Sequence, residues 1–191
     1  MATNDSIIVA VTGASGSIYA KRLISVLLEK DFQIKLIISD AAKKVIAHEL
    51  GSENPYDDFR IADERVTLYD NDNIAAAIAS GTSRKNSMVV IPASMGTTAR
   101  IACGISSTLI ERAADVVIKE SGHLVLVPRE TPLSSIHLEN MLKLSRMGVS
   151  IIPAAPAFYH KPESIDDLVD FIITKVLDSL RIDNDLIKRY E

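Results

Sequence analysis

Short apolar runs alternate with amphipathic stretches along most of the chain. Apolar, β-branched runs occupy Ile7–Thr12 and Gln33–Ile38, and such short runs predict buried strands. Further strands are predicted at residues 87–91, 124–127 and 149–152. Apolar positions three and four apart predict helices at residues 19–30, 41–50, 97–120, 134–147 and 165–180. Apolar strands between amphipathic helices predict an α/β fold, a doubly wound parallel sheet.

Residues 51–73 depart from this alternation. They are polar and rich in aspartate, with one weak apolar run at Val66–Leu68, so we expect an irregular excursion rather than a second domain. The charged tail carries apolar and aromatic residues at near-helical spacing, namely Ile182, Leu186, Ile187 and Tyr190. We therefore expect one domain over residues 1–191, with the tail at 181–191 docking on a neighbouring subunit.

Composition narrows the class of protein. The 21 Lys and Arg against 25 Asp and Glu give a net charge of −4, which disfavours nucleic acid as a partner. No secretory leader is visible in the first residues, and no apolar run approaches the roughly 18 residues that span a bilayer. The single cysteine, Cys103, cannot form an internal disulfide, and its small apolar neighbours predict a buried thiol. We expect a soluble, cytoplasmic protein.

The turns that follow the strands are the candidate sites, because ligands of an open parallel sheet bind outside the carboxyl ends of its strands. The first turn, Thr12–Ser17, offers small residues and N–H groups at a helix N-terminus, which suit a phosphate. Counting from Gly13, the third and sixth positions are Ser15 and Ile18, so the Gly-x-Gly-x-x-Gly fingerprint is missing. A mononucleotide therefore fits better than a nicotinamide dinucleotide, and a plain tight turn is the alternative.

Three further turns carry polar groups. Ser39 precedes a predicted helix, and a simple N-cap would explain it. The Ser94-Met95-Gly96-Thr97 turn has hydroxyls that could bind a heterocycle or a phosphate. Arg129 and Glu130 lie between two prolines that restrict the backbone. Arg129 could hold phosphate oxygens and Glu130 could act as acid or base, whereas the alternative is a surface ion pair.

The last turn is rich in alanine and proline and ends in Phe158 and Tyr159, which could line an apolar pocket or pack in the core. Metal binding has little support, since the histidines form no pair at ligand spacing and there is no cysteine pair. The Gly13–Gly16 turn is one residue too short for a Gly-x-Ser-x-Gly nucleophile elbow, which disfavours a hydrolase.

Several longer motifs occur in a fixed order, at residues 13–16, 94–97, 112–116, 126–133, 137–141 and 156–159. In this order they resemble the UbiX family of flavin prenyltransferases over nearly the whole chain, and the PRETPL and HLENM blocks are the most specific. The resemblance implies a Rossmann-like flavoprotein fold, a reaction that needs no metal, and assembly into a homododecamer. Members join a dimethylallyl group from dimethylallyl phosphate to N5 and then C6 of reduced FMN, and UbiD-type decarboxylases use the product. They were long described as decarboxylases themselves.

The resemblance also implies roles for individual residues. FMN would contact Gly13, Ala14, Ser15, Ser39, Ser94, Met95, Gly96, Thr97 and Arg129. The prenyl donor would contact Tyr159, Lys175, Arg112 and Tyr190. The catalytic residues would be Glu130, Ser15, Glu49, Lys119 and Arg112. Lys175 and Tyr190 depart from the arginine and tryptophan frequent in the family, and a lysine holds phosphate as a point charge rather than as a fork.

Two other functions stay open at this point. One is an FMN-dependent cysteine decarboxylase of related fold, although its Pro-x-Met-Asn motif is not seen and Ser94-Met95-Gly96 lacks the asparagine. The other is a flavin carrier without catalytic activity. The Arg129–Glu130 pair and a second phosphate site argue against a mere carrier.

Overall fold

The computed structural model describes residues 6–81 and 87–188. Its strands form a six-stranded parallel sheet in the order β3-β2-β1-β4-β5-β6. The strands are β1 (Ser6–Val11), β2 (Gln33–Ile38), β3 (Val66–Tyr69), β4 (Ser87–Ala93), β5 (His123–Pro128) and β6 (Ser150–Ile151). The α-helices are α1 (Ser17–Glu29), α2 (Asp40–Leu50), α3 (Met95–Ala102), α4 (Leu109–Lys119), α5 (Ser135–Arg146) and α6 (Ile165–Leu180). The predicted doubly wound α/β sheet is confirmed.

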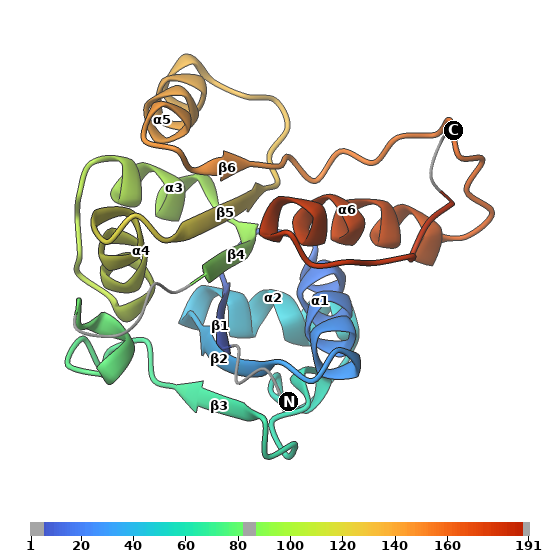
Figure 1. The fold of residues 1–191 in the computed structure, drawn as a ribbon, viewed down its shortest axis with the longest axis horizontal. Helices are drawn as coiled ribbons and strands as arrows, with labels where there is room; N and C mark the ends of the chain where they lie inside the picture. The colour runs from blue at the N-terminus through green and yellow to red at the C-terminus, as the bar shows by residue number, and fades with distance from the viewer. Residues whose placement is uncertain (1–5, 82–86, 189–191) are drawn as a thin grey trace.

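Helices cover both faces of the sheet, and Figure 1 shows α1 and α6 on one side with α3 and α4 on the other. Successive residues of a strand point to opposite faces, so Val9 packs with α1, α2 and α6, whereas Ile8 packs with α3, α4 and α5. Because both faces are buried, the inner strands are almost entirely apolar, which made them recognisable in the sequence.

The interpretation of residues 51–73 as irregular is wrong for one segment, because Val66–Tyr69 forms strand β3. It pairs in parallel with β2, with Val66 opposite Ile34. This strand lies at the edge of the sheet and buries Val66 while Thr67 and Leu68 stay exposed. A strand with so little buried surface leaves only a weak apolar pattern.

The predicted helical stretch at residues 97–120 is two helices, α3 and α4. The Ser94–Thr97 turn is the N-cap and first turn of α3. Cys103 ends this helix and is exposed, so the prediction of a buried thiol is wrong. Cys103 lies where the chain leaves α3 for the connection to α4, and there its side chain is exposed instead of packed in the core.

The described part of the tail covers its own chain. Ile182, Leu186 and Ile187 pack against the core on the α1 and α6 side of the sheet. The expectation that these residues have no face of their own chain to cover is therefore wrong. Tyr190 lies outside the described residues, and docking of the tail on a neighbouring subunit stays a prediction. Within residues 6–81 and 87–188, no helix combines the length and the apolar character needed to cross a bilayer.

Candidate functional site

The buried hydroxyl of Thr12 joins the turns after β1 and β4, where the strand order reverses. It donates to the carbonyl of Pro92 at 2.7 Å and accepts from the N–H of Ser94 at 2.7 Å. Because the hydroxyl donates one of these hydrogen bonds and accepts the other, it fixes the distance between the two turns. Thr12 belonged to the first candidate turn, but no role was predicted for it, although a hydroxyl ending an apolar strand was a signal.

Hydrogen bonds also connect the other turns at this edge. Ser39 donates its N–H to the carbonyl of Val11 at 3.0 Å, and Ala154 donates its N–H to the carbonyl of Pro128 at 2.9 Å. Arg129 reaches from the turn after β5 to the carbonyl of Ser15 in the turn after β1. We call residues 12–17, 39, 94–97, 129–130 and 153–160 the carboxyl-edge turns. The structure thus brings most of the predicted FMN residues together.

The first turn is tightly packed against α2. A Cβ placed on Gly13 would lie 2.5 Å from the Cβ of Ala41, so no side chain fits there without movement. Ala14 is buried, and Ser15 is exposed at the tip. Because Gly13 lets the turn pack closely on α2, Ser15 lies exposed at the tip of the turn, where its side chain bonds to Glu49.

The N-terminus of α1 is occupied by a carboxylate of the same chain. Glu49 accepts the N–H of Gly16 at 3.0 Å and that of Ser17 at 2.8 Å. Burial alone would raise the pKa of Glu49, but hydrogen bonds from Ser15, Ser17 and Gly16 outweigh it and lower that pKa. The expectation that these N–H groups are free to bind phosphate is therefore wrong for Gly16 and Ser17.

Helix N-caps account for two of the predicted hydroxyls. Ser39 caps α2 by accepting the N–H of Ala42 at 3.2 Å, as the simpler interpretation of this residue predicted. Ser94 caps α3, and its hydroxyl lies 3.0 Å from that of Thr97. The first N–H groups of α3, from Met95 and Gly96, have no carbonyl one turn earlier in the helix to bind. This helix N-terminus, unlike that of α1, can face a ligand.

A buried carboxylate that the sequence analysis missed supports α3. Glu111 is 1% exposed and accepts from Arg100 and from the N–H and hydroxyl of Ser107. Arg100 also donates to Thr97 at 3.3 Å. Burial by itself would raise the pKa of Glu111, but the hydrogen bonds of Ser107 and Arg100 hold that pKa below its ordinary value. A capping box at Thr108 was the available signal.

Arg129 and Glu130 do not form the surface ion pair that was the alternative interpretation. Arg129 is half-buried and donates to the carbonyl of Ser15, whereas the exposed Glu130 accepts the N–H of Thr131 at 3.1 Å. No ion pair joins the two side chains in the described part of the chain. The pair therefore presents a cation and a carboxylate separately to the carboxyl edge.

The residues predicted to bind the donor, together with Lys119 of the predicted catalytic set, lie in more than one part of the chain. Tyr159 and Lys175 lie against the same buried ring, that of Phe171. Arg112 pairs with Asp115 at 3.2 Å on α4. Lys119 ends α4 just before β5 begins, so it lies at the amino edge of the sheet, away from the carboxyl-edge turns. Within one chain, Lys119 therefore does not lie at the carboxyl-edge turns.

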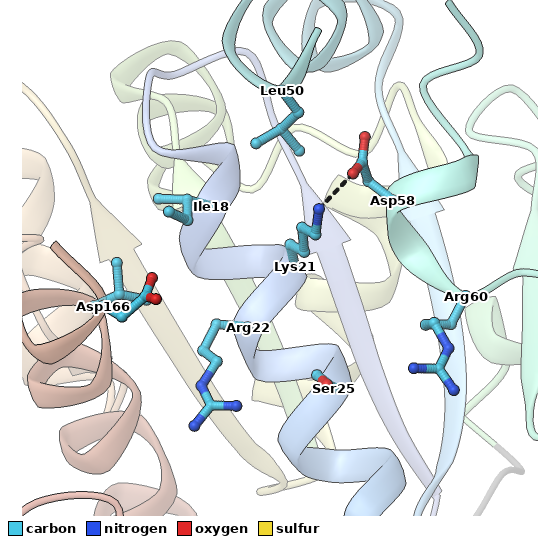
Figure 2. Close-up of a pocket in the computed structure, with 9 residues that line it drawn as sticks. Ile18, Lys21, Arg22, Ser25, Leu50, Asp58, Arg60 and Asp166 are labelled. Carbon is cyan, nitrogen blue, oxygen red and sulfur yellow. Dashed lines mark hydrogen bonds and ion pairs between the residues drawn. The ribbon is translucent and has the colours of Figure 1, made fainter. Parts of the chain in front are cut away.

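Two pockets lie near the carboxyl-edge turns. One, of about 360 Å³, lies between α1, the end of α2 and the beginning of α6. Lys21 reaches Asp58 there at 2.6 Å, and Figure 2 shows this pair among the lining residues. None of the predicted site residues lines this pocket. The second, of about 390 Å³, lies at the carboxyl ends of β2 and β3 and is lined by Lys43, Tyr56 and Tyr69.

The donor set at the carboxyl edge fits FMN. The hydroxyls of Ser94 and Thr97, the N–H groups that begin α3 and the guanidinium of Arg129 are the groups that bind phosphate and flavin ring edges in water-poor sites. No group of three or more His, Cys, Asp or Glu side chains gathers at metal-binding distance within the described ranges.

Comparison with known proteins places the chain in a family. The sequence matches the Flavoprotein family over residues 1–177. The flavin prenyltransferase UbiX of Methanothermobacter thermautotrophicus is 50% identical, over 96% of this chain and 94% of the relative. The structure of AnUbiX in complex with FMN and dimethylallyl pyrophosphate has a TM-score of 0.92 and 37% identity, covering 98% of each chain. A dodecameric FMN-dependent UbiX-like decarboxylase from Escherichia coli has a TM-score of 0.90 and 42% identity, over 97% of this chain and 99% of that chain. At these identities over nearly its full length, the chain belongs to the UbiX family of flavin prenyltransferases.

Proposed function

We propose that this protein joins the dimethylallyl group of dimethylallyl phosphate to reduced FMN. The observation that supports this proposal most directly is that the carboxyl-edge turns lie together. They bring the guanidinium of Arg129, the paired hydroxyls of Ser94 and Thr97, and the beginning of α3 to one edge of the sheet. The relative that is 50% identical bears the name flavin prenyltransferase, and the similar AnUbiX structure contains FMN with a dimethylallyl diphosphate.

FMN binding falls to the turns after β1, β2, β4 and β5. Arg129 uses one N–H for the carbonyl of Ser15, so its remaining donors are available to the FMN phosphate or ring. The accessible Ser15 and the Ser94–Thr97 turn supply hydrogen bonds to the polar edges of the flavin. Reduced FMN supplies the nucleophilic nitrogen N5 and ring carbon C6 when it is bound.

Prenyl transfer breaks the bond between the allylic carbon and the phosphate oxygen, and the electron pair leaves with the phosphate. A first bond forms from N5 to the allylic carbon as N5 loses its proton. A second bond then forms from C6 to the prenyl chain, as the C=C double bond of the chain takes up one proton and C6 loses one. Fixed cations such as Lys175 can neutralise the leaving phosphate, so the reaction requires no metal. The exposed carboxylate of Glu130 is suited to receive a proton.

The complete site would need more than one copy of the chain. Lys119 lies at the amino edge of its own sheet, so it can reach a carboxyl-edge site only from a neighbour. Helix α5 exposes Ile136 (65%), Leu138 (53%) and Leu142 (51%), an apolar surface that suits burial between subunits. Because a similar UbiX-like protein is dodecameric, we infer that this protein is a homododecamer. We further propose that it is cytoplasmic and that Tyr190 takes part in a subunit contact.

The prenylated flavin would be the cofactor of a separate decarboxylase of the UbiD type. The alternative is that this protein is itself a decarboxylase, and carbon dioxide release distinguishes the two. The purified protein is incubated with an aromatic or α,β-unsaturated acid, and separately with a cysteine-terminated peptide. Neither should lose carbon dioxide. Addition of the flavin product to a UbiD-type apoenzyme should start decarboxylation of the acid. Release of carbon dioxide by this protein alone would refute the prenyltransferase assignment.

A further inference from the structure

One guanidinium joins α3 to α4 and also reaches a hydroxyl of the carboxyl-edge turns. The Nε of Arg100, in the second turn of α3, donates to the carboxylate of Glu111 on α4. Its Nη2 donates to the hydroxyl oxygen of Thr97 at 3.3 Å. A Cβ placed on Gly96 would lie 3.5 Å from Nη1, so the guanidinium extends back to the first turn of α3. Neither Arg100 nor Glu111 was a predicted site residue.

A buried carboxylate holds this guanidinium in place. Glu111 is 1% exposed, and it accepts the N–H of Ser107 at 2.9 Å and the hydroxyl of Ser107 at 2.6 Å. It also accepts the N–H of Thr108 at 3.0 Å. A buried carboxylate keeps its charge only with such partners, and one that is fixed on every side has little freedom to move. Arg100 is therefore anchored, although its side chain is 44% exposed.

The hydroxyls of Ser94 and Thr97 have one hydrogen more than they can share. Their oxygens lie 3.0 Å apart, so one of the two O–H groups donates to the other. A guanidinium can only donate, so the Thr97 oxygen accepts from Arg100. The Ser94 oxygen likewise accepts the N–H of Thr97 at 3.3 Å. One O–H therefore remains, and it has no acceptor within residues 6–81 and 87–188.

This remaining hydrogen makes the hydroxyl pair a donor site. Thr97 is 5% exposed and Ser94 is half-buried, so the hydrogen lies where water has limited access. The N–H groups of Met95 and Gly96, which begin the same helix, are donors too. A set made only of donors selects an oxygen that carries negative charge. Without Arg100, the Thr97 oxygen would be open to other donors, and the pair could accept as well as donate.

We propose that Arg100 is a positioning residue for FMN, held by Glu111 and acting through Thr97 so that the hydroxyl pair donates to an oxygen of FMN. The inference rests on the proposed function, which assigns FMN to the carboxyl-edge turns. Arg100 acts without touching the reacting atoms. The accepting oxygen belongs to the phosphate or to the flavin ring, and riboflavin, which lacks the phosphate, distinguishes the two.

The test compares Arg100→Lys with Arg22→Lys, the same change in an ion pair on the other face of the sheet. Arg22 on α1 pairs with Asp170 on α6 at 2.6 Å, and its side chain is 34% exposed. A lysine keeps an ion pair with one carboxylate, but as a point charge it does not also hold Thr97 as the planar fork does. Arg100→Lys alone should raise the Kd for FMN about three- to tenfold in fluorescence titration.

Further measurements separate positioning from support of the helix. The KM for reduced FMN should rise while kcat holds, because a contact to an oxygen that does not react binds ground state and transition state alike. Thr97→Val removes the acceptor of Arg100, so Arg100→Lys should add little to the loss that Thr97→Val causes. The Kd for riboflavin should rise as much as that for FMN if the ring accepts, and should stay at the wild-type value if the phosphate accepts.

Equal Kd values for FMN in Arg100→Lys and Arg22→Lys would overturn the inference, and so would fully additive losses in the double variant. Wild-type protein that binds FMN but yields no prenylated flavin would refute the proposed function and leave the binding comparison to decide on Arg100. Wild-type protein that binds no FMN would refute both.

Discussion

The side chain of Arg129 donates a hydrogen bond from Nε to the backbone carbonyl of Ser15 at 3.3 Å, across 114 residues of sequence. The contact joins the turn after β5 to the turn after β1, with the turn after β4 between them. A guanidinium has five N–H donors in a fixed plane, so one bond to Ser15 orients the group and leaves the others for a ligand. We therefore propose that Arg129 and Ser15 form one wall of the FMN site.

Substitutions at Arg129 and Glu130 should separate binding from chemistry. Arg129→Ala should weaken FMN binding about 10–100-fold, because a charge-assisted contact is lost. Glu130→Gln keeps the shape of the side chain, so the Kd for FMN should hold while flavin prenylation falls by roughly 10²–10⁴-fold. Fluorescence titration of FMN and product chromatography measure the two effects. Wild-type turnover by Glu130→Gln would remove Glu130 from the catalytic residues.

Removal of the Thr12 hydroxyl should loosen the contact between the turns after β1 and β4. Thr12→Val keeps the shape of the side chain but leaves the N–H of Ser94 without its acceptor, which costs about 1–3 kcal/mol for a buried group. Urea unfolding should show this loss, and FMN binding should weaken with it. Thr12→Ser retains the hydroxyl and is the matched control. Equal stability of the valine and serine variants would mean that the bridge contributes nothing.

Glu49 makes a pH-dependent contribution to stability. Its pKa is lowered in the folded protein from the ordinary value of 4.5, so the folded state favours the ionised carboxylate. The stabilisation is therefore fully present above pH 4.5 and is lost as the pH falls through the folded pKa. Glu49→Ala should cost about 1 kcal/mol at neutral pH, as for a lost helix cap.

The matched control is Glu53→Gln, since Glu53 is exposed and makes no ion pair in the described part of the chain. Thermal unfolding at neutral pH and below 4.5 measures both variants. The gap between wild type and Glu49→Ala should narrow in acid, whereas the control should track wild type throughout. A gap that stays constant with pH would contradict the role of the ionised Glu49.

Subunit contacts should matter more for prenyl transfer than for FMN binding. Light scattering should report a large homo-oligomer, and a monomer would contradict the proposed assembly. Deletion of residues 183–191 also removes Leu186 and Ile187, which pack on the core, so it should lower stability as well as activity. Tyr190→Ala is the sharper change, because it keeps Leu186 and Ile187 in the chain. It should slow prenyl transfer with little effect on the Kd for FMN.

The elements with buried faces were predictable, because burial imposes a periodic apolar pattern. Helix α6 was expected at residues 165–180 and lies at Ile165–Leu180. Strand β3 was missed because it lies at the edge and buries little beyond Val66. The position of Cys103 depends on how α3 meets α4, which local composition does not encode.

Within the site, residue types and their place after a strand were predictable, but their partners were not. Nothing in the spacing of Glu49 and Gly16 shows that the end of α2 covers the beginning of α1. The same holds for Arg129 and Ser15, which tertiary packing brings together. Phe171 has the pattern of an ordinary core residue in the sequence, and only the structure shows Tyr159 and Lys175 against it.

The central claim is transfer of a prenyl group to flavin, and the mass of the flavin tests it most directly. The protein is incubated without oxygen with reduced FMN and dimethylallyl phosphate, and the flavin is then extracted for mass spectrometry and absorbance. We expect its mass to increase by one dimethylallyl group, with an altered spectrum and release of inorganic phosphate. FMN recovered with its mass unchanged, from protein shown to bind both FMN and the donor, would contradict the account.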